Sequence, residues 1–591
     1  MDIVIEKADI DKAADLLINT YKISTYFLHK LIDQSWHNSL NESLSELSRD
    51  GFPDMKKIKG EDFCKFVVIK EGFSLFSGSK KRELRRLILE KFDPIVIDQL
   101  YAENIKDGTY KNPAHRITAL SKLKWINGKK WAQEFVNTAG FPPVFAGIVQ
   151  AKTLLPTFEK IQPKTPDRKL KDFQNYLKDR MLEILELEHE KTRCIVSLPT
   201  GGGKTRVAVE AFIEWMYPRF SRGEFMIWIA QSEELCDQAT ACISEIWGKR
   251  EYVEDLTLVR YYKGTDVSLK QLETCEGGVV VASINQIYNR IMKGDIAIDY
   301  ILKNTGAIII DEAHRAITSM YKKLFSRANE VRKGLFPVCG LTATPGRSDG
   351  FTDKLVDLFE ARLLTPTFDN EPDYDQGDPL EFFKKSGYLA RANHRIIKTD
   401  FETTLSESEL RDLIDAKKSG ADPDGVNETE KRLLKEMALD GKRNALIIRE
   451  LLKLPNESRS LIYACTVEHA LYLSAMLNLY SKTAAAISSD TNTVERRKLI
   501  AAFKEGRIKY IFNYGVLTTG FDAPRTDHIV LCRPIFSDVL YEQIVGRGMR
   551  GPAFDGTEEC TIIDFSDTVR NMGLPLAYAR FQNYWDSEID E

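Results

Sequence analysis

Short runs of apolar residues, each long enough for one buried strand, recur along most of the chain and alternate with stretches of helical periodicity. One set covers residues 225–230, 279–283, 307–310 and 338–342, and a second set covers 461–466, 510–514, 528–533 and 561–565. A helical pattern, such as that from Val494 to Lys504, separates neighbouring runs. Strands that alternate with helices in this way are typical of parallel sheets covered by helices. The pattern therefore predicts an α/β protein with two parallel-sheet domains.

The remaining parts of the chain have a different pattern. Residues 1–160 are mostly helical in periodicity and carry no motif of known chemistry, which predicts an N-terminal helical accessory domain of unknown role. The first sheet domain is expected at 161–365 and the second at 442–591. Residues 366–441 between them are charged and helix-prone, which predicts a helical insert or linker.

Composition narrows the class of protein. Because hydrophobic residues make up 43% of the chain and charged residues 29%, it has the balance of a soluble globular protein. No apolar run reaches the length of a bilayer span, and the acidic start lacks a signal peptide's basic region, so we expect a cytoplasmic location and no membrane contact. A net charge of −4 argues against a scaffold that binds nucleic acid through an overall basic field. The cysteines are scattered singly, which disfavours zinc and iron–sulfur sites.

A glycine-rich stretch follows the strand-like residues 193–198 and precedes a helical pattern. It consists of Thr200, Gly201, Gly202, Gly203, Lys204 and Thr205. Glycines in this context let backbone N–H groups close around phosphate oxygens, because no side chain blocks the approach. Lys204 can then neutralise the β- and γ-phosphates, and the Thr205 hydroxyl can bind Mg²⁺. Leu198 stands where the strict phosphate-loop pattern has its first glycine, and an ordinary glycine-rich turn is the alternative.

A second candidate site, Asp311-Glu312-Ala313-His314, follows the apolar residues 307–310. That run is apolar enough for a strand buried on both faces, so the acids emerge at its carboxyl end, where ligands bind in open α/β sheets. Asp311 can hold Mg²⁺ through water, and Glu312 can orient and deprotonate the attacking water. The alternative is a helix start that favours acidic residues. Together with the glycine-rich stretch, the tetrapeptide predicts hydrolysis of a nucleoside triphosphate.

Two arginines follow the second set of strands, in the segment Gln543-Ile544-Val545-Gly546-Arg547-Gly548-Met549-Arg550. Residues three apart share one helical face, so Arg547 and Arg550 can point together at a γ-phosphate across a cleft. The alternative is a solvated basic face near a helix end, which explains neither Gln543 nor the position of the segment. We therefore predict that both arginines are catalytic.

With these residues in place, the chain resembles a superfamily-two helicase or translocase of the DEAH type over about residues 165–570. Other segments similar to family motifs are 228–235, 280–286, 341–345, 460–466 and 513–524. The resemblance implies two tandem RecA-like domains that use ATP and Mg²⁺. It also implies nucleotide contacts by Gln174 at the adenine and by Gly520 and Asp522 near the ribose. Residues implied to couple hydrolysis to nucleic-acid engagement are His314, Thr342 and Thr344. Gln543 is implied to be catalytic together with the two arginines.

The resemblance also suggests a substrate. Residues 520–524 and 378–391 look more like restriction-type and repair-type DNA translocases than like RNA-remodelling proteins. DNA is therefore favoured over RNA, and the chain is expected to be the motor of a restriction, repair or antiviral-defence complex. No nuclease constellation stands out, so a nuclease or effector would be a protein partner, docked through residues 1–160. The alternatives are an RNA helicase, and a nucleic-acid-sensing ATPase switch that recruits an effector.

Lysines alternate with tryptophans in residues 122–131 of the N-terminal region. Such a mixture can bind nucleic acid, with ammonium groups at phosphates and the Trp125 and Trp131 indoles stacked on bases. The alternative is a helix whose tryptophans enter the core while its lysines face water. Burial of the two indoles decides between these interpretations.

Overall fold

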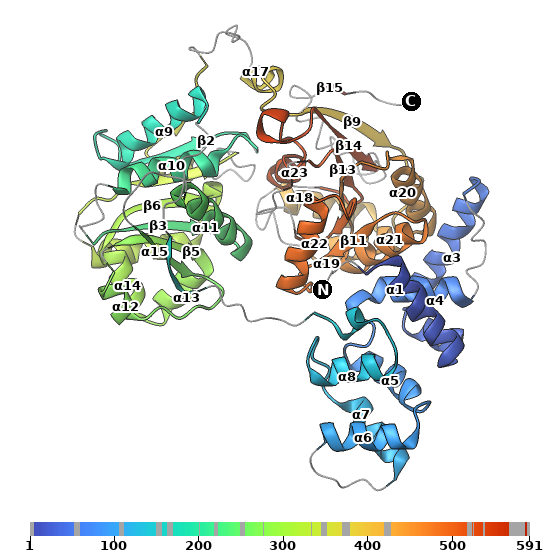
Figure 1. Ribbon diagram of the computed structural model, residues 1–591. Coiled ribbons are helices and arrows are strands. Elements are labelled where there is room, and N and C mark those ends of the chain that lie inside the picture. Colours follow the sequence, from blue (N-terminus) through green and yellow to red (C-terminus); the bar gives the residue numbers. More distant parts are fainter. Residues whose placement is uncertain are drawn as a thin grey trace.

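A computed structural model shows two α/β lobes and a helical N-terminal region (Figure 1). The structure describes residues 5–52, 60–105, 112–148, 156–161, 170–199, 201–217, 223–248, 255–275, 277–332, 334–343, 352–368, 379–418, 427–516, 523, 525–535, 538–565 and 586–587. Among the helices within these ranges, none combines the length and the apolar character needed to cross a bilayer.

The sheet of the first lobe contains eight strands within the described ranges, in the order β1-β4-β5-β3-β6-β7-β2-β8. These strands are β1 Phe158–Ile161, β2 Arg193–Ser197, β3 Phe225–Ala230, β4 Leu256–Tyr261, β5 Gly278–Ser283, β6 Thr305–Asp311, β7 Val338–Thr342 and β8 Leu363–Leu364. Only β1 runs antiparallel to its described neighbour, β4. The predicted strands at 225–230 and 338–342 agree with β3 and β7 at both ends.

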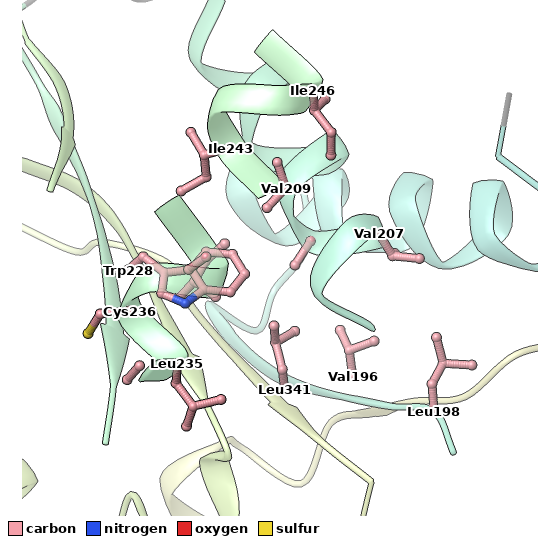
Figure 2. Close-up of a cluster of buried hydrophobic side chains, with 14 of the residues drawn as sticks. Val196, Leu198, Val207, Val209, Trp228, Leu235, Cys236, Ile243, Ile246 and Leu341 are labelled. Carbon is pink, nitrogen blue, oxygen red and sulfur yellow. The ribbon is translucent and has the colours of Figure 1, made fainter. Parts of the chain in front are cut away.

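Helices cover both faces of the first sheet. They are α9 Asp172–Leu185, α10 Lys204–Met216, α11 Glu233–Gly248, α12 Leu269–Glu273, α13 Ile284–Met292, α14 Ile296–Lys303, α15 Ser319–Val331 and α16 Thr352–Leu358. Figure 2 shows Trp228 of β3 on the face that it shares with Val209 of α10 and Ile243 of α11. The next residue, Ile229, lies in the core on the other face, with α13 to α16. Because both faces are buried, the strand is continuously apolar.

The sheet of the second lobe is parallel throughout its seven described strands, in the order β11-β12-β10-β13-β14-β9-β15. The strands are β9 Arg391–Ile397, β10 Ser460–Tyr463, β11 Ala484–Ile487, β12 Tyr510–Asn513, β13 His528–Leu531, β14 Glu559–Phe565 and β15 Asp586–Ser587. Its helices are α17 Pro379–Lys385, α18 Glu407–Lys418, α19 Glu428–Leu439, α20 Gly441–Lys453, α21 Val467–Leu479, α22 Thr493–Lys504 and α23 Asp538–Val545. The prediction of two parallel-sheet domains is confirmed.

The expectation that residues 366–441 are helical is wrong for residues 391–397. This segment forms β9, which pairs with β14 along its whole length. Ala392 and His394 are buried, whereas their neighbours Arg391 and Asn393 are exposed. A strand with polar side chains on one face lacks the continuous apolar run that identified the other strands, so the sequence pattern concealed it.

The N-terminal region is helical, as predicted. Its elements are α1 Lys7–Asp15, the π-helical η1 Leu16–Thr20, α2 Thr25–Lys30, α3 Gln34–Arg49, α4 Gly60–Glu71, α5 Arg82–Leu89, α6 Pro94–Asn104, α7 Pro113–Lys122 and α8 Lys130–Thr138. Short 3-10 turns lie at η2 Gly72–Ser74, η3 Ser79–Lys81 and η4 Pro143–Ala146.

Helices α3 and α4 pack directly on α20 and α21 of the second lobe. A Cβ added to Gly441 would lie 2.6 Å from that of Glu42, so only glycine permits this close approach. The Ser43 hydroxyl donates to the Gly441 carbonyl at 2.8 Å and accepts from the Tyr472 hydroxyl at 3.0 Å. Apolar side chains of the N-terminal helices and of the second lobe form one continuous core. The N-terminal helices are therefore packed as an extension of the second lobe.

Trp125 and Trp131 lie in this core, only 9% and 7% exposed. Both rings pack against Phe135, at centroid distances of 5.7 and 5.8 Å. The structure thus supports the core interpretation of residues 122–131, since neither indole is available to stack on a base.

We expect Trp131→Ala to lower the free energy of unfolding by about 3 kcal/mol, because it leaves a cavity beside Phe135. Chemical denaturation followed by circular dichroism measures this change. Lys124→Ala is the matched control, since Lys124 is an exposed cation in the same segment. Unchanged stability together with weaker binding of single-stranded nucleic acid would contradict the core interpretation.

Candidate active site

The glycine-rich loop connects β2 to α10 at the carboxyl edge of the first sheet. Gly201 and Gly203 have φ angles of +90° and +87°, in the left-handed region that favours glycine. A Cβ on Gly203 would also lie 2.5 Å from Nε2 of Gln174. The positive φ angles therefore favour glycine at both positions, and the nearby Gln174 side chain leaves no space for a larger residue at Gly203. Thr200, which was predicted to belong to this loop, lies outside the described residues.

Lys204 begins α10 and folds back over the loop. Its Nζ donates hydrogen bonds to the carbonyl oxygens of Leu198 at 2.7 Å and Pro199 at 3.3 Å. Thr205 follows in the first turn of the helix and is half-buried. The amino end of a helix carries a partial positive charge and several N–H groups without helical partners. Loop, lysine and helix end thus form a cradle suited to an anion.

Asp311 and Glu312 lie at the end of β6, opposite this cradle. Asp311 is buried, and its Oδ1 accepts a hydrogen bond from the Glu312 backbone N–H at 3.0 Å. Burial raises the pKa of the Asp311 carboxyl above its usual range, and the charge of Glu312 raises this pKa further. The charges of Lys204 and Arg547 lower it. The carboxylate of Asp311 therefore lies within electrostatic reach of cations from both lobes.

The backbone at Glu312 is left-handed, with a φ of +53°, which is uncommon for a residue with a side chain. Its Oε2 lies 3.4 Å from Nδ1 of His314, and the same nitrogen lies 3.2 Å from the Thr342 hydroxyl. His314 and Thr342 are both buried. His314 thus connects the acid at the end of β6 to the end of β7, while Thr344 lies outside the described residues.

Gln174 lies in the first turn of α9, beneath the glycine-rich loop. Its Nε2 donates to the Gly202 carbonyl at 3.2 Å, and its Oε1 accepts from the Lys171 backbone N–H at 3.1 Å. The side chain is 3% exposed. In this arrangement Gln174 ties the start of α9 to the loop, and its adenine contact stays a prediction.

An aromatic cluster beside Gln174, which the sequence pattern did not identify, joins the two lobes. Phe173 packs against Phe383 and Tyr388, at centroid distances of 5.1 and 5.2 Å. The Lys171 ammonium lies 5.6 Å from the centre of the Tyr388 ring. The only signal in the sequence is the group of aromatic residues near position 383, which is as typical of an ordinary core as of a contact between lobes.

The second lobe contributes Arg547 and Arg550, which the sequence predicts to share one face of a helix. Helix α23 ends at Val545, so the two arginines follow the helix and do not share a helical face. Arg550 forms a β-bridge with Leu389. A Cβ on Gly201 would lie 3.7 Å from the Cα of Arg550, so the glycine-rich loop closely approaches the second lobe here. Tertiary packing, not helical periodicity, therefore brings Arg550 near the loop.

Gln543 lies within α23 and is 7% exposed, and its Nε2 has no hydrogen-bond partner among the described residues. The helix is anchored by Tyr541, whose hydroxyl lies 3.1 Å from Nε2 of His394 on β9. Gly520 and Asp522, predicted near the ribose, lie outside the described residues.

The residues present fit a magnesium nucleotide. The loop glycines carry no side chain that could block phosphate oxygens. Lys204 supplies a positive charge at the mouth of the cradle. The Thr205 hydroxyl and the Asp311 carboxylate are oxygen donors, and Mg²⁺ in nucleotide sites commonly has one or two protein ligands, with phosphates and water completing the shell. The described residues contain no cluster of three or more His, Cys, Asp or Glu that would indicate a site built wholly of protein ligands.

Two family models match the chain. Residues 167–347 match "Type III restriction enzyme, res subunit", and residues 442–551 match "Helicase conserved C-terminal domain". The first match contains the glycine-rich loop and Asp311, and the second contains Arg547 and Arg550. Each match therefore contains the candidate site residues of one lobe.

Relatives and solved structures extend the comparison. A Saccharomyces cerevisiae protein named as the ATP-dependent helicase IRC3 is 26% identical over 404 residues, 67% of this chain and 51% of the relative. A Schizosaccharomyces pombe protein named as the mitochondrial ATP-dependent helicase irc3 is 24% identical over 65% of this chain and 55% of the relative. The chain thus spans about half the length of these curated relatives. The structure of Mss116p bound to ssRNA and AMP-PNP is 16% identical, with a TM-score of 0.46 over 73% of this chain and 82% of that one.

Proposed function

The chain belongs to the superfamily-two helicases of restriction and repair type, and from this premise we propose that it couples ATP hydrolysis to movement on nucleic acid as a helicase or translocase. One observation carries the proposal. The glycine-rich loop of the first lobe lies against Arg550 of the second, at the edge where Asp311 and Glu312 emerge. A site whose residues come from two lobes is complete only when the lobes lie close together. Hydrolysis at such a site can therefore be coupled to movement of one lobe relative to the other.

Within this proposal each side chain has a role. Lys204 turns from the Leu198 and Pro199 carbonyls toward the β- and γ-phosphates. Thr205 and Asp311 hold Mg²⁺, which when bound neutralises charge on the phosphate oxygens. Glu312 accepts a proton from the attacking water. Arg547 and Arg550 donate hydrogen bonds from the second lobe to the developing charge.

The other predicted site residues keep their proposed roles. Gln174 contacts adenine, Gln543 supports the arginines, and His314 with Thr342 couples the acid at β6 to β7. Four residues outside the described ranges complete the proposal: Thr200 in the loop, Gly520 and Asp522 near the ribose, and Thr344 beside Thr342.

We propose DNA as the substrate, and a restriction, repair or antiviral-defence complex as the setting, with a nuclease or effector bound through residues 1–160. The domain limits at 1–160, 161–365 and 442–591 and a cytoplasmic location belong to the same proposal, whereas residues 391–397 of the expected linker 366–441 belong to the sheet of the second lobe. A nucleic-acid-sensing switch is the alternative that the N-terminal region favours, because its helices share a core with the second lobe and would transmit a lobe movement to a docked partner.

A panel of single-stranded DNA, duplex DNA and RNA, scored for both ATPase stimulation and strand displacement, tests the proposal. Stimulation by DNA together with displacement or translocation is the expected result. Preference for RNA would identify an RNA helicase, and stimulation without any movement would identify the switch. Absence of ATP hydrolysis with every nucleic acid would overturn the proposal itself.

Glu312→Gln should keep ATP binding and lose turnover, because the amide cannot accept the proton of the attacking water. We expect a fall of about a hundredfold or more in kcat, within the range usual for a general base. Nucleic acid should then be held more stably with ATP present than without it. Filter binding and single-turnover hydrolysis measure the two effects, and equal nucleic-acid affinity with and without ATP would contradict the coupling.

A further inference from the structure

An ion pair joins the lobes away from the residues assigned to ATP. Nη2 of Arg497 on α22 lies 3.2 Å from Oδ2 of Asp237 on α11. Figure 1 shows α11 on the side of the first lobe that faces α22 of the second. Neither residue belongs to the glycine-rich loop, to the acids at β6 or to the arginines after α23. The contact therefore adds a further point of attachment between the lobes.

The Asp237 carboxylate is held in place from its own lobe. Its Oδ1 accepts a hydrogen bond from the Tyr262 hydroxyl at 2.9 Å, and its Oδ2 accepts one from the Lys263 ammonium at 2.5 Å. Lys263 balances the charge of Asp237 whether or not Arg497 is present. Separation of the lobes would thus leave no buried unpaired charge. The free-energy cost of breaking the ion pair between Asp237 and Arg497 is therefore low.

The lobes also approach each other at the glycine-rich loop and pack together through the aromatic cluster of Phe173, Phe383 and Tyr388. Both of these regions lie beside the loop, because Gln174, the neighbour of Phe173, donates a hydrogen bond to the Gly202 carbonyl. The ion pair between α11 and α22 lies on other elements, so it restricts rotation of the lobes about the loop. It thereby favours the arrangement in which the segment after α23 lies near the glycine-rich loop.

We propose that Asp237 and Arg497 are positioning residues, which stabilise the closed arrangement of the lobes and so place Arg547 at the nucleotide. The inference rests on the proposed function and deepens it, because it assigns the control of closure to residues outside the nucleotide contacts. Arg497 is 49% and Asp237 28% exposed at the side chain, so water screens their attraction. A pair of this kind should shift the closed-to-open equilibrium by about two- to fivefold.

Arg497→Ala, Asp237→Asn and the double variant of the full chain test the inference. Lys498→Ala is the matched control, since Lys498 is a neighbouring exposed cation on α22. Pulsed electron paramagnetic resonance on spin labels, one in each lobe, measures the distribution of interlobe distances. This distribution should broaden in all three variants and not in the control. The double variant should show no more broadening than either single one.

Kinetics separate a positioning role from a structural one. We expect kcat to fall by about two- to fivefold in the three variants, with little change in KM for ATP. At about 1 M salt, where screening removes exposed attractions, wild type and variants should converge. Additive effects of the two substitutions, or a distance distribution like that of Lys498→Ala, would overturn the inference. If wild-type protein hydrolyses no ATP, the proposed function fails, but the distance measurement still decides whether the pair holds the lobes.

Discussion

Lys204→Ala is expected to reduce ATP hydrolysis by about a hundred- to a thousandfold while leaving the fold intact, in line with the loss of one preorganised charge at a reacting phosphate. The structure explains why the fold should survive. Lys204 is only partly buried, and its Nζ donates hydrogen bonds to the Leu198 and Pro199 carbonyls at the rim of the loop. Water can replace such contacts at a cost of about 1 kcal/mol each.

Steady-state ATPase assays and thermal unfolding, carried out on the same preparations, check this expectation. Lys303→Ala serves as the control, because Lys303 is an exposed lysine at the end of α14 in the same lobe. Hydrolysis by Lys204→Ala near the wild-type rate would mean that the glycine-rich loop is an ordinary turn. A large loss of thermal stability would instead assign the lysine to the fold.

Arg547→Ala is the second substitution with a large expected effect, and it should act on turnover rather than on binding. The loss in kcat could reach about a thousandfold for an arginine that stabilises charge only in the transition state. The affinity for ATP should change little, because Lys204 and the loop of the first lobe provide most ground-state contacts. In the structure the charge of Arg547 lowers the pKa of the Asp311 carboxyl, so this arginine of the second lobe acts electrostatically on an acid of the first.

Single-turnover rates and equilibrium binding of a fluorescent ATP analogue separate the two quantities. Arg507→Ala is the matched control, since Arg507 is an exposed arginine of the second lobe that pairs with Glu505. A raised KM with unchanged kcat would show that Arg547 contributes ordinary ground-state binding.

The sequence alone determined the two sheets and the residue types at the candidate site of the first lobe. Strands buried on both faces are continuously apolar, as in β3 and β7, so their limits are encoded in a few adjacent residues. The glycine-rich loop and Asp311 are also local signals, because each depends on residue types that directly follow a strand. Hydrophobic periodicity and sequence motifs each depend on a short stretch of residues, so they can be recognised without knowledge of tertiary contacts.

Only the tertiary structure decided how distant segments meet. It showed that Arg547 lies beyond α23, that polar residues in 391–397 form a strand, and that Trp125 and Trp131 are buried. It also placed Arg497 beside Asp237, which is 260 residues away in the chain. No local pattern encodes these contacts, because each depends on the shape and spacing of two surfaces that fold from different parts of the sequence. The residue types at the site were therefore readable from the sequence, whereas their assembly across two lobes was fixed by packing.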